Sequence, residues 1–354
     1  SEIPIDSIKN LRIAEEIESV GGGIDAYGGN NSFGVTLEVM SDDRILGVNM
    51  LADVLHNPSF PGEALERQRE VQMAALRAQD DKLLQKTFRL MRENLFGGHG
   101  YGLDALGTQD SVTNLDLGSV TDLHKQLAVP NNSVLAIFGD IKISEIRAEL
   151  ERAFGLWTEG SQFKVPNLMY GTDGIMRVAN QADKEQAVVV LGYRGCTFFD
   201  EDRYALELLS EACSDLGSRL FMRIREELGL AYYVGAQSQP GLTPGYFSFY
   251  AGTSAEHLEQ VEEELLKQSA KLSSEGLSEE EIKRCKAKMI GQRKIARQDL
   301  GGLAMAAGLD ELYGLGFDSS DNDEERIMKI TTADVQAVAG KYLTPEHYVL
   351  AVTH

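Results

Sequence analysis

Hydrolytic metal centres are built from histidine, cysteine and carboxylate side chains that the fold brings together at short spacing. The chain has six histidines, and no two of them lie within one helical turn of each other: His56, His99, His124, His257, His347 and His354. Its three cysteines are widely separated and form no C-x-x-C pair: Cys196, Cys213 and Cys285. The spacing therefore predicts no metal site, and we expect the cysteines to be buried, inert thiols.

The composition is that of an ordinary globular protein. Of 354 residues, 43% are hydrophobic and 25% are charged, and no stretch approaches the roughly 20 continuous apolar residues of a membrane span. The first residues, 1–6, have neither the basic start nor the long apolar run of a signal peptide. Since a signal can be removed from a mature chain, the compartment stays open. We expect a soluble protein of the bacterial periplasm or cytoplasm.

The formal net charge is −21, so the surface as a whole repels nucleic acid and anionic lipid. This charge has two interpretations, a simple contribution to solubility and a preference for basic peptides. Charge alone does not decide between them. We therefore expect no nucleic-acid partner and no membrane span.

Helical and strand-like patterns alternate along the first half of the chain. Phe33 to Val39 alternates apolar and polar residues, as a half-buried strand does. Pro61 opens a pattern that predicts one long helix through about Leu95. The apolar run from Ser133 to Phe138 predicts a strand that closes this half.

The second half repeats these elements in the same order. The predicted strand at Tyr246–Tyr250 corresponds to Phe33–Val39, and that at Tyr348–Val352 corresponds to Ser133–Phe138. A long helix starts at Leu277, as one does in the first half. The offset is roughly 215 residues, far longer than the period of a solenoid. It indicates tandem duplication of one domain.

These patterns predict an α+β protein of two homologous domains, each a mostly antiparallel sheet packed with helices. Residues 156–172 contain glycine, serine and proline without clean periodicity, as a linker does. We therefore expect domains at residues 1–160 and 176–354, joined by a linker at 161–175.

Four segments carry a resemblance to a known family. They are Ile13–Gly22 with Asp25–Tyr27; Leu51–Phe60 with Leu65–Val71; Gly100–Gly102 with Leu106–Gly107 and Ser111–Val112; and Ser218–Val234. In this order they resemble the pitrilysin/insulinase zinc peptidases and the mitochondrial processing peptidases. The resemblance covers nearly the whole chain, and the fourth segment is the most specific.

The resemblance implies a zinc site that this sequence does not provide. In such peptidases an inverted H-x-x-E-H helix and a downstream glutamate hold zinc. The sequence has no H-x-x-E-H, and the resemblance places that motif just before residue 1. The downstream ligand position is Ala75, and Gln68 replaces a further glutamate. We therefore expect the first domain to lack the zinc motif and the chain to bind no metal cofactor.

The same resemblance assigns substrate binding to the second domain. The family's arginine and tyrosine, which face the zinc site, match Arg225 and Tyr232. Arg225 would hold the substrate backbone, and Tyr232 would donate to the developing oxyanion. The alternative is a surface arginine and a core tyrosine without a role in binding. Arg223 and Tyr233 match the spacing less well.

Three functions remain open. The first is a non-catalytic subunit that binds peptides and completes the active site of a zinc-bearing homologous partner; the alternative partner is a second copy of the chain, in a self-dimer. The second is a structural or peptide-binding module with no catalytic role. The third is a metalloendopeptidase whose H-x-x-E-H segment is missing from this sequence. We expect zinc to be in a catalytic partner, and this chain alone to be inactive.

Overall fold

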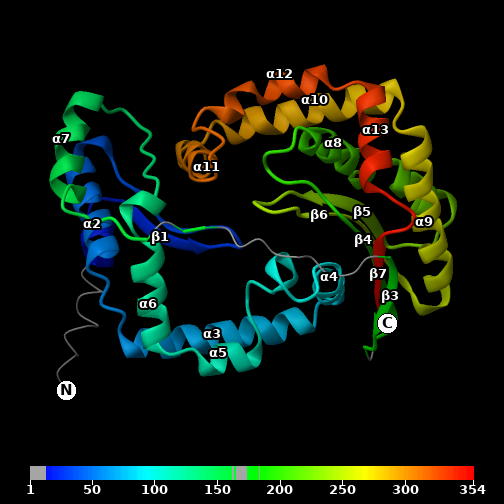
Figure 1. Ribbon diagram of the computed structural model, residues 1–354, viewed down its shortest axis with the longest axis horizontal. Helices are drawn as coiled ribbons and strands as arrows, with labels where there is room; N and C mark the ends of the chain where they lie inside the picture. The colour runs from blue at the N-terminus through cyan, green and yellow to red at the C-terminus, as the bar shows by residue number, and fades with distance from the viewer. Residues whose placement is uncertain (1–12, 162, 165–173, 183) are drawn as a thin grey trace. The chain divides into compact units, whose positions relative to one another are not determined.

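The computed structural model describes residues 13–161, 163–164, 174–182 and 184–354. The chain forms two compact units, each assembled from separate stretches of sequence (Figure 1). The first unit contains Ser1–Ala74, Thr108–Val165 and Ala296–Ser320, and the second contains Ala75–Gly107, Pro166–Ile295 and Asp321–His354. Each half of the sequence thus contributes a segment to the unit formed mainly by the other half.

The first unit combines a β-hairpin with helices. Strands β1 (Gly23–Gly28) and β2 (Phe33–Glu38) pair in antiparallel register. Residues 13–19 are helical. The other helices of this unit are α2 (Arg44–His56), most of α3 (Gly62–Asp80), α5 (Gln109–Asn114), α6 (Leu117–Leu127), α7 (Ile143–Phe154) and α11 (Leu300–Leu312).

The second unit is built on a five-stranded mixed sheet in the order β3-β7-β4-β6-β5. The strands are β3 (Ile175–Asn180), β4 (Gln186–Arg194), β5 (Tyr233–Gln239), β6 (Tyr246–Ser254) and β7 (Tyr348–Thr353). Only β3 and β7 are parallel; the other three pairings are antiparallel. The helices are α4 (Leu83–Leu95), α8 (Asp202–Ser214), α9 (Leu258–Glu275), α10 (Glu279–Ala296), α12 (Asp323–Lys329) and α13 (Thr332–Tyr342). The predicted α+β class, with mostly antiparallel pairing, is confirmed.

Strand β4 is apolar along its length because helices cover both faces of the sheet. Val188 and Val190 are buried in one cluster with the side chains of α4. Val189 and Leu191 are buried in another with α8, α9, α10 and α13. Figure 1 shows α4 on one side of this sheet and α8, α9 and α13 on the other. A strand covered on both sides has no solvent face to mark with polar residues.

The predicted internal repeat is visible in matching helices. α4 and α11 both have 13 residues, and α6 and α13 both have 11. In each pair, the second helix begins roughly 215 residues after the first. The residues that cap α6 and α13, Asp116 and Thr331, both accept a hydrogen bond from a backbone N–H of the first turn. The two halves therefore share helix start signals as well as element order.

The prediction of one helix from Pro61 to Leu95 is wrong. The chain forms α3 and then α4, and between them Lys82 is extended, with φ −95° and ψ 99°. Asp80 and Asp81 explain the break, since their negative charges oppose the helix dipole at the C-terminal end. Aspartate also has low helix propensity.

The predicted strand at Ser133–Phe138 is also wrong. Residues 133–138 have no ladder partner among the described residues, and Val134, Leu135 and Phe138 are 40%, 44% and 43% exposed. The corresponding strand of the second half, β7, lies between β3 and β4 and pairs with both. An apolar segment becomes a strand only where neighbours accept its backbone hydrogen bonds.

Part of the predicted division at 161–175 lies outside the described residues, so the boundaries 1–160 and 176–354 stay a prediction. The three cysteines are buried and unpaired by disulfides, as expected. Among the helices of the described residues, none is both long enough and apolar enough to cross a membrane.

Met91 on α4 tests the packing of that helix against the second-unit sheet. Its side chain is fully buried, and the space beside it exists because β4 has Gly192, where a Cβ would lie 2.3 Å from the Met91 sulfur. We expect Met91→Ala to lower the free energy of unfolding by about 2–5 kcal/mol in urea denaturation. The control is Met328→Ala, at a 58% exposed position of α12, which should change it by less than about 0.5 kcal/mol. Equal effects of the two changes would contradict the assigned packing.

Candidate substrate-binding segment

A short helix between α8 and β5 contains Arg225. Residues 219–227 are helical, and Phe221–Glu227 (η4) form a π-helical turn. Leu220 and Ile224, one turn apart, face the core and are fully buried. Their burial fixes which side of the helix faces the solvent. Arg225 lies on the exposed side.

A glycine turn connects this helix to Tyr232. Gly229 has φ of +64°, a conformation that other residues adopt only with strain. Its N–H donates to the carbonyl of Arg225 at 3.1 Å, which closes the helix. The N–H of Tyr232 then donates to the carbonyl of Gly252 on β6 at 2.8 Å, just before β5 begins. The turn therefore ends at a residue held by the sheet.

Arg225 and Tyr232 both present unoccupied polar groups to the solvent. The guanidinium carbon of Arg225 lies 4.8 Å from the centre of the Phe221 ring. Among the described residues, neither this guanidinium nor the hydroxyl of Tyr232 makes a hydrogen bond or ion pair. Tyr232 is 55% exposed. Stacking on Phe221 supports the arginine side chain but leaves its five N–H donors available.

The guanidinium of the neighbouring arginine, Arg223, is paired with two carboxylates. Arg223 donates through Nε to Glu264 on α9 at 3.1 Å and through Nη1 to Glu227 at 2.8 Å. Burial raises the pKa of Glu264, but hydrogen bonds from Gln268 and Arg223 outweigh it and lower the pKa overall. Arg223 is therefore part of the framework and has fewer donors left for a ligand.

The ring of the neighbouring tyrosine, Tyr233, packs against strand β6. The ring of Tyr233 lies 6.5 Å from that of Tyr250 and fills the space above Gly252. Burial, with a contribution from Tyr250, raises the pKa of Tyr233. Tyr232 is the more exposed of the two residues, at 55% against 36% for Tyr233.

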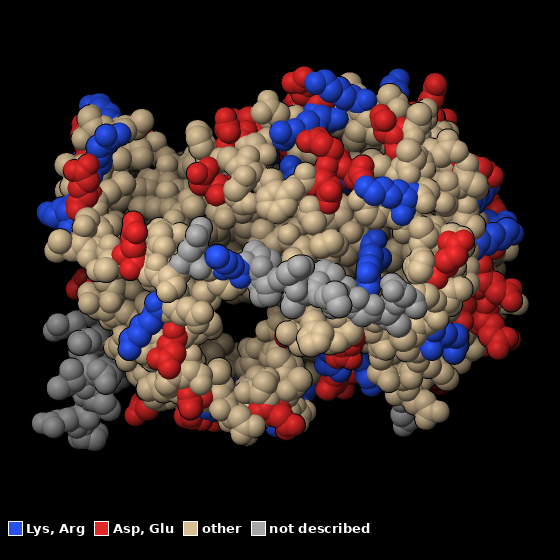
Figure 2. Space-filling model, in the orientation of Figure 1, with Lys and Arg blue, Asp and Glu red and all other residues tan. Residues whose placement is uncertain are grey.

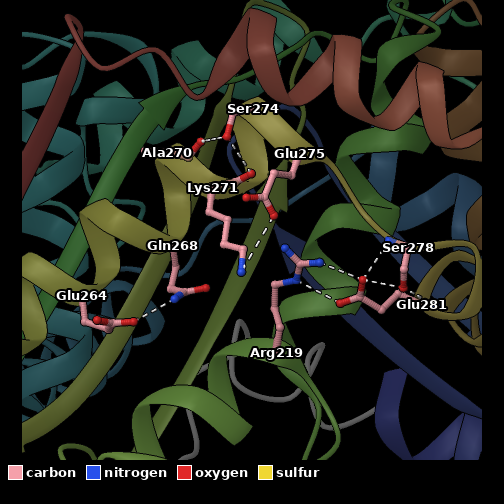
Figure 3. Close-up of polar contacts among 9 residues, drawn as sticks. All are labelled: Arg219, Glu264, Gln268, Ala270, Lys271, Ser274, Glu275, Ser278 and Glu281. Carbon is pink, nitrogen blue, oxygen red and sulfur yellow. Dashed lines mark hydrogen bonds and ion pairs between the residues drawn. The ribbon is translucent and has the colours of Figure 1, made fainter.

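The contacts that anchor this helix were not predicted from the sequence. Arg219 donates to both carboxylate oxygens of Glu281, from Nε at 2.9 Å and from Nη2 at 2.7 Å (Figure 3). Glu281 lies in the first turn of α10 and also accepts from the backbone N–H of Ser278 at 2.8 Å. Burial raises the pKa of Glu281, but the hydrogen bonds from Arg219 and Ser278 outweigh it and hold the pKa at about 2. The Ser-x-x-Glu spacing, typical of a capping box, is the signal that was available.

The zinc-ligand positions named from the resemblance lie on α3. Gln68 lines a cavity of about 590 Å³ in the first unit, together with two carboxylates, Glu16 and Asp53. Ala75 is two helical turns further along α3 and offers only a methyl group. Among the described residues, no three histidine, cysteine or carboxylate side chains gather to hold a metal. Zinc takes nitrogen, thiolate or carboxylate ligands, so these positions do not fit it.

The histidines of the first unit have packing roles. The ring of His56 lies 5.3 Å from that of Phe154 and 5.0 Å from that of Trp157. The ring of His124 lies 5.4 Å from that of Phe60, and burial lowers the pKa of His124.

Acidic and basic side chains are interspersed on the face seen in Figure 2, and no broad basic area is visible on it.

Comparison with known proteins places the fold and the motifs in one family. Residues 7–109 match the family model described as "Insulinase (Peptidase family M16)", and residues 114–289 match that of the "Peptidase M16 inactive domain". The chain belongs to peptidase family M16. The predicted resemblance to pitrilysin and insulinase is thereby confirmed.

Several known proteins resemble this chain over most of its length. An uncharacterized zinc protease of Rickettsia bellii is 27% identical over 93% of this chain and 80% of its own length. The solved M16 inactive domain from Pseudomonas fluorescens has a TM-score of 0.87 and 20% identity, covering 96% of this chain and 82% of its own. A chain of complex III2 from Candida albicans has a TM-score of 0.74 and 16% identity, covering 96% and 85%. At these identities the two structures establish the fold alone.

The anchoring contacts predict different stability effects for two nearby arginines. Arg219 is 20% exposed and pairs with Glu281, so Arg219→Ala should lower the free energy of unfolding by about 1–3 kcal/mol. Arg225→Ala removes no hydrogen bond and should change it by less than about 0.5 kcal/mol. Urea denaturation of the two variants checks this. A large loss for Arg225→Ala would show that its guanidinium has a structural partner.

Glu281 should also contribute to stability in a pH-dependent way. Its pKa in the folded protein, about 2, lies below the ordinary value of 4.5. The contribution is therefore complete above about pH 4.5 and is lost as the pH falls toward 2. We expect Glu281→Gln to lose less stability than the unchanged protein between pH 5 and pH 2, measured by urea denaturation. Identical acid dependence would contradict the assigned contacts.

Proposed function

We propose that this M16 chain is a non-catalytic subunit that binds peptide and completes the active site of a zinc-bearing homologous subunit. The observation that carries the proposal is the contrast within the Ser218–Tyr233 segment. The guanidinium of Arg223 is paired with Glu264 and Glu227, and the ring of Tyr233 packs against Tyr250. Among the described residues, the guanidinium of Arg225 has no hydrogen-bond partner, and Tyr232 is the more exposed of the two tyrosines and also has an unpaired hydroxyl. Side chains that are supported but unpaired are suited to bind a ligand.

Both side chains match the polar groups of a peptide. The forked N–H donors of Arg225 suit a backbone carbonyl oxygen or a carboxylate. The hydroxyl of Tyr232 can donate to the oxygen that becomes negative when the scissile carbonyl is attacked. A donor placed there lowers the barrier because its bond strengthens as the charge develops.

The chain's own α3 helix supports a division of labour between subunits. Zinc in a partner would supply the activated water for peptide hydrolysis. This chain has alanine at position 75, where the resemblance implies a carboxylate ligand, and glutamine at position 68. Both substitutions lie inside the chain, so they count against an independent zinc site whatever precedes residue 1. Peptide binding through Arg225 and Tyr232 does not depend on either position.

A second candidate is a structural module with no role in cleavage. The fold similarity to a chain of complex III2 favours it, since that assembly is not named as a peptidase. In that case the free donors of Arg225 and Tyr232 would have no ligand. Their substitution would leave every activity of the assembled complex unchanged.

The test is peptide cleavage by the complex that co-purifies with an H-x-x-E-H-bearing homologue. We expect Arg225→Ala and Tyr232→Phe each to lower kcat/KM by about 100-fold or more, as loss of a transition-state donor does. The matched control is Tyr233→Phe, which also removes one hydroxyl from a tyrosine and should change kcat/KM less than about threefold. Unchanged cleavage in both Arg225→Ala and Tyr232→Phe, or failure of any such homologue to co-purify, would reject the shared site.

A further inference from the structure

The helix that presents Arg225 has an unusual geometry. In the π-helical turn Phe221–Glu227, the N–H of Leu228 donates to the carbonyl of Arg223, five residues earlier, at 3.2 Å. An additional residue in a turn rotates each later side chain by about 100° relative to an α-helix. The direction of Arg225 therefore depends on this wide turn being kept.

Arg219 fixes the start of that turn. It lies in the last α-helical residues before Phe221, and its guanidinium donates two hydrogen bonds to the carboxylate of Glu281. Both side chains are mostly buried, at 20% and 18% exposure. Two parallel hydrogen bonds of this kind fix the relative orientation of the guanidinium and the carboxylate as well as the distance between them. In Figure 3 the Arg219 side chain points from its helix straight to Glu281.

The acceptor is itself immobilised. Glu281 accepts from the N–H and the hydroxyl of Ser278, both at 2.8 Å, and its own N–H donates to the Ser278 hydroxyl at 3.3 Å. This reciprocal cap fixes the carboxylate at the start of α10. α10 is anchored in the core by Ile282, Cys285 and Met289. Arg219 is therefore held by the framework of the unit and not by a mobile surface side chain.

A second contact holds the same helix from α9. Arg223 pairs with Glu264, which is kept in place by the amide of Gln268 at 2.7 Å. Arg219 and Arg223 are one α-helical turn apart and point to α10 and α9, respectively. The helix is thus fastened at two points, and Arg225 lies two residues after the second.

We propose that Arg219, held by Glu281, is a positioning residue that orients Arg225 toward a bound peptide. This inference rests on the proposed peptide-binding function and names a residue that acts in it without touching the substrate. The donors of Arg219 that face Glu281 are occupied, so its influence passes through the π-helical turn to Arg225.

A double-mutant cycle separates this role from a general effect on folding. The enzyme is the complex with the zinc-bearing homologue, and the variants are Arg219→Gln, Arg225→Ala and the double variant. We expect Arg219→Gln to lower kcat/KM about tenfold alone and less than twofold when Arg225 is already alanine. A positioning residue has nothing left to position once its target is removed.

Two results would overturn the inference. One is an unchanged kcat/KM for Arg219→Gln. The other is the same fold-loss for Arg219→Gln in both backgrounds, which would show that it acts independently of Arg225. An unchanged kcat/KM for Arg225→Ala would overturn the inference as well, because Arg219 would then have no functional side chain to orient. The proposed function itself is rejected only if Tyr232→Phe also leaves kcat/KM unchanged.

The matched control is Arg293→Gln. Arg293 also pairs with two carboxylates of this unit, Glu207 at 2.7 Å and Asp323 at 3.1 Å. In the described part of the chain, its guanidinium forms no hydrogen bond or ion pair with the Arg225 helix. It should lower stability without changing kcat/KM. If Arg219→Gln does not assemble with the partner, Arg219→Lys takes its place in the cycle, because lysine keeps the charge and loses the fork. The same pair of outcomes then applies.

Discussion

The second unit depends on burying strand β4 on both of its faces. Its alternate residues, Val188 and Val189 among them, lie in two different hydrophobic clusters. Each large side chain buried in this way contributes roughly 1.5–3 kcal/mol. One cluster requires α4, which comes from the first half of the sequence. Strands β5 and β6 belong to this sheet. The hydrogen bond from Tyr232 to Gly252 on β6 fixes one end of the candidate substrate-binding segment, Ser218–Tyr233.

The other end of that segment is fixed by charge. Arg219 and Arg223 fasten the helix to α10 and α9, and the two carboxylates they use are largely buried. Burying such pairs is unfavourable unless the geometry is good and the other lone pairs are satisfied. Here Ser278 and Gln268 satisfy them. The result is a rigid support with Arg225 on its exposed side, which is the arrangement that ligand binding requires.

Much of the fold was predictable because its signals are local. Apolar runs such as Tyr348–Val352 and the repeated order of the elements identified the strands, the helices and their duplication. The two wrong predictions have different causes: one depends on residues distant in the sequence, and the other on a local charge signal that the apolar pattern hides. The Ser133–Phe138 run needs neighbouring strands that no described residue supplies, and the Asp80–Asp81 pair ended a helix that the apolar pattern alone would continue. The choice of Arg225 came from the family resemblance, but the reason Arg223 is unsuitable lies in Glu264, which is distant in sequence and close only in the fold.

The central claim is that this chain contributes substrate-binding groups to peptide hydrolysis without a zinc of its own. The most direct measurement is the metal content of the full-length protein, purified alone and then with a zinc-bearing homologue. The account predicts far less than one zinc per chain and no peptide cleavage for the protein alone, and zinc together with cleavage only in the complex. One tightly held zinc per chain, with proteolysis by the isolated protein, would contradict it.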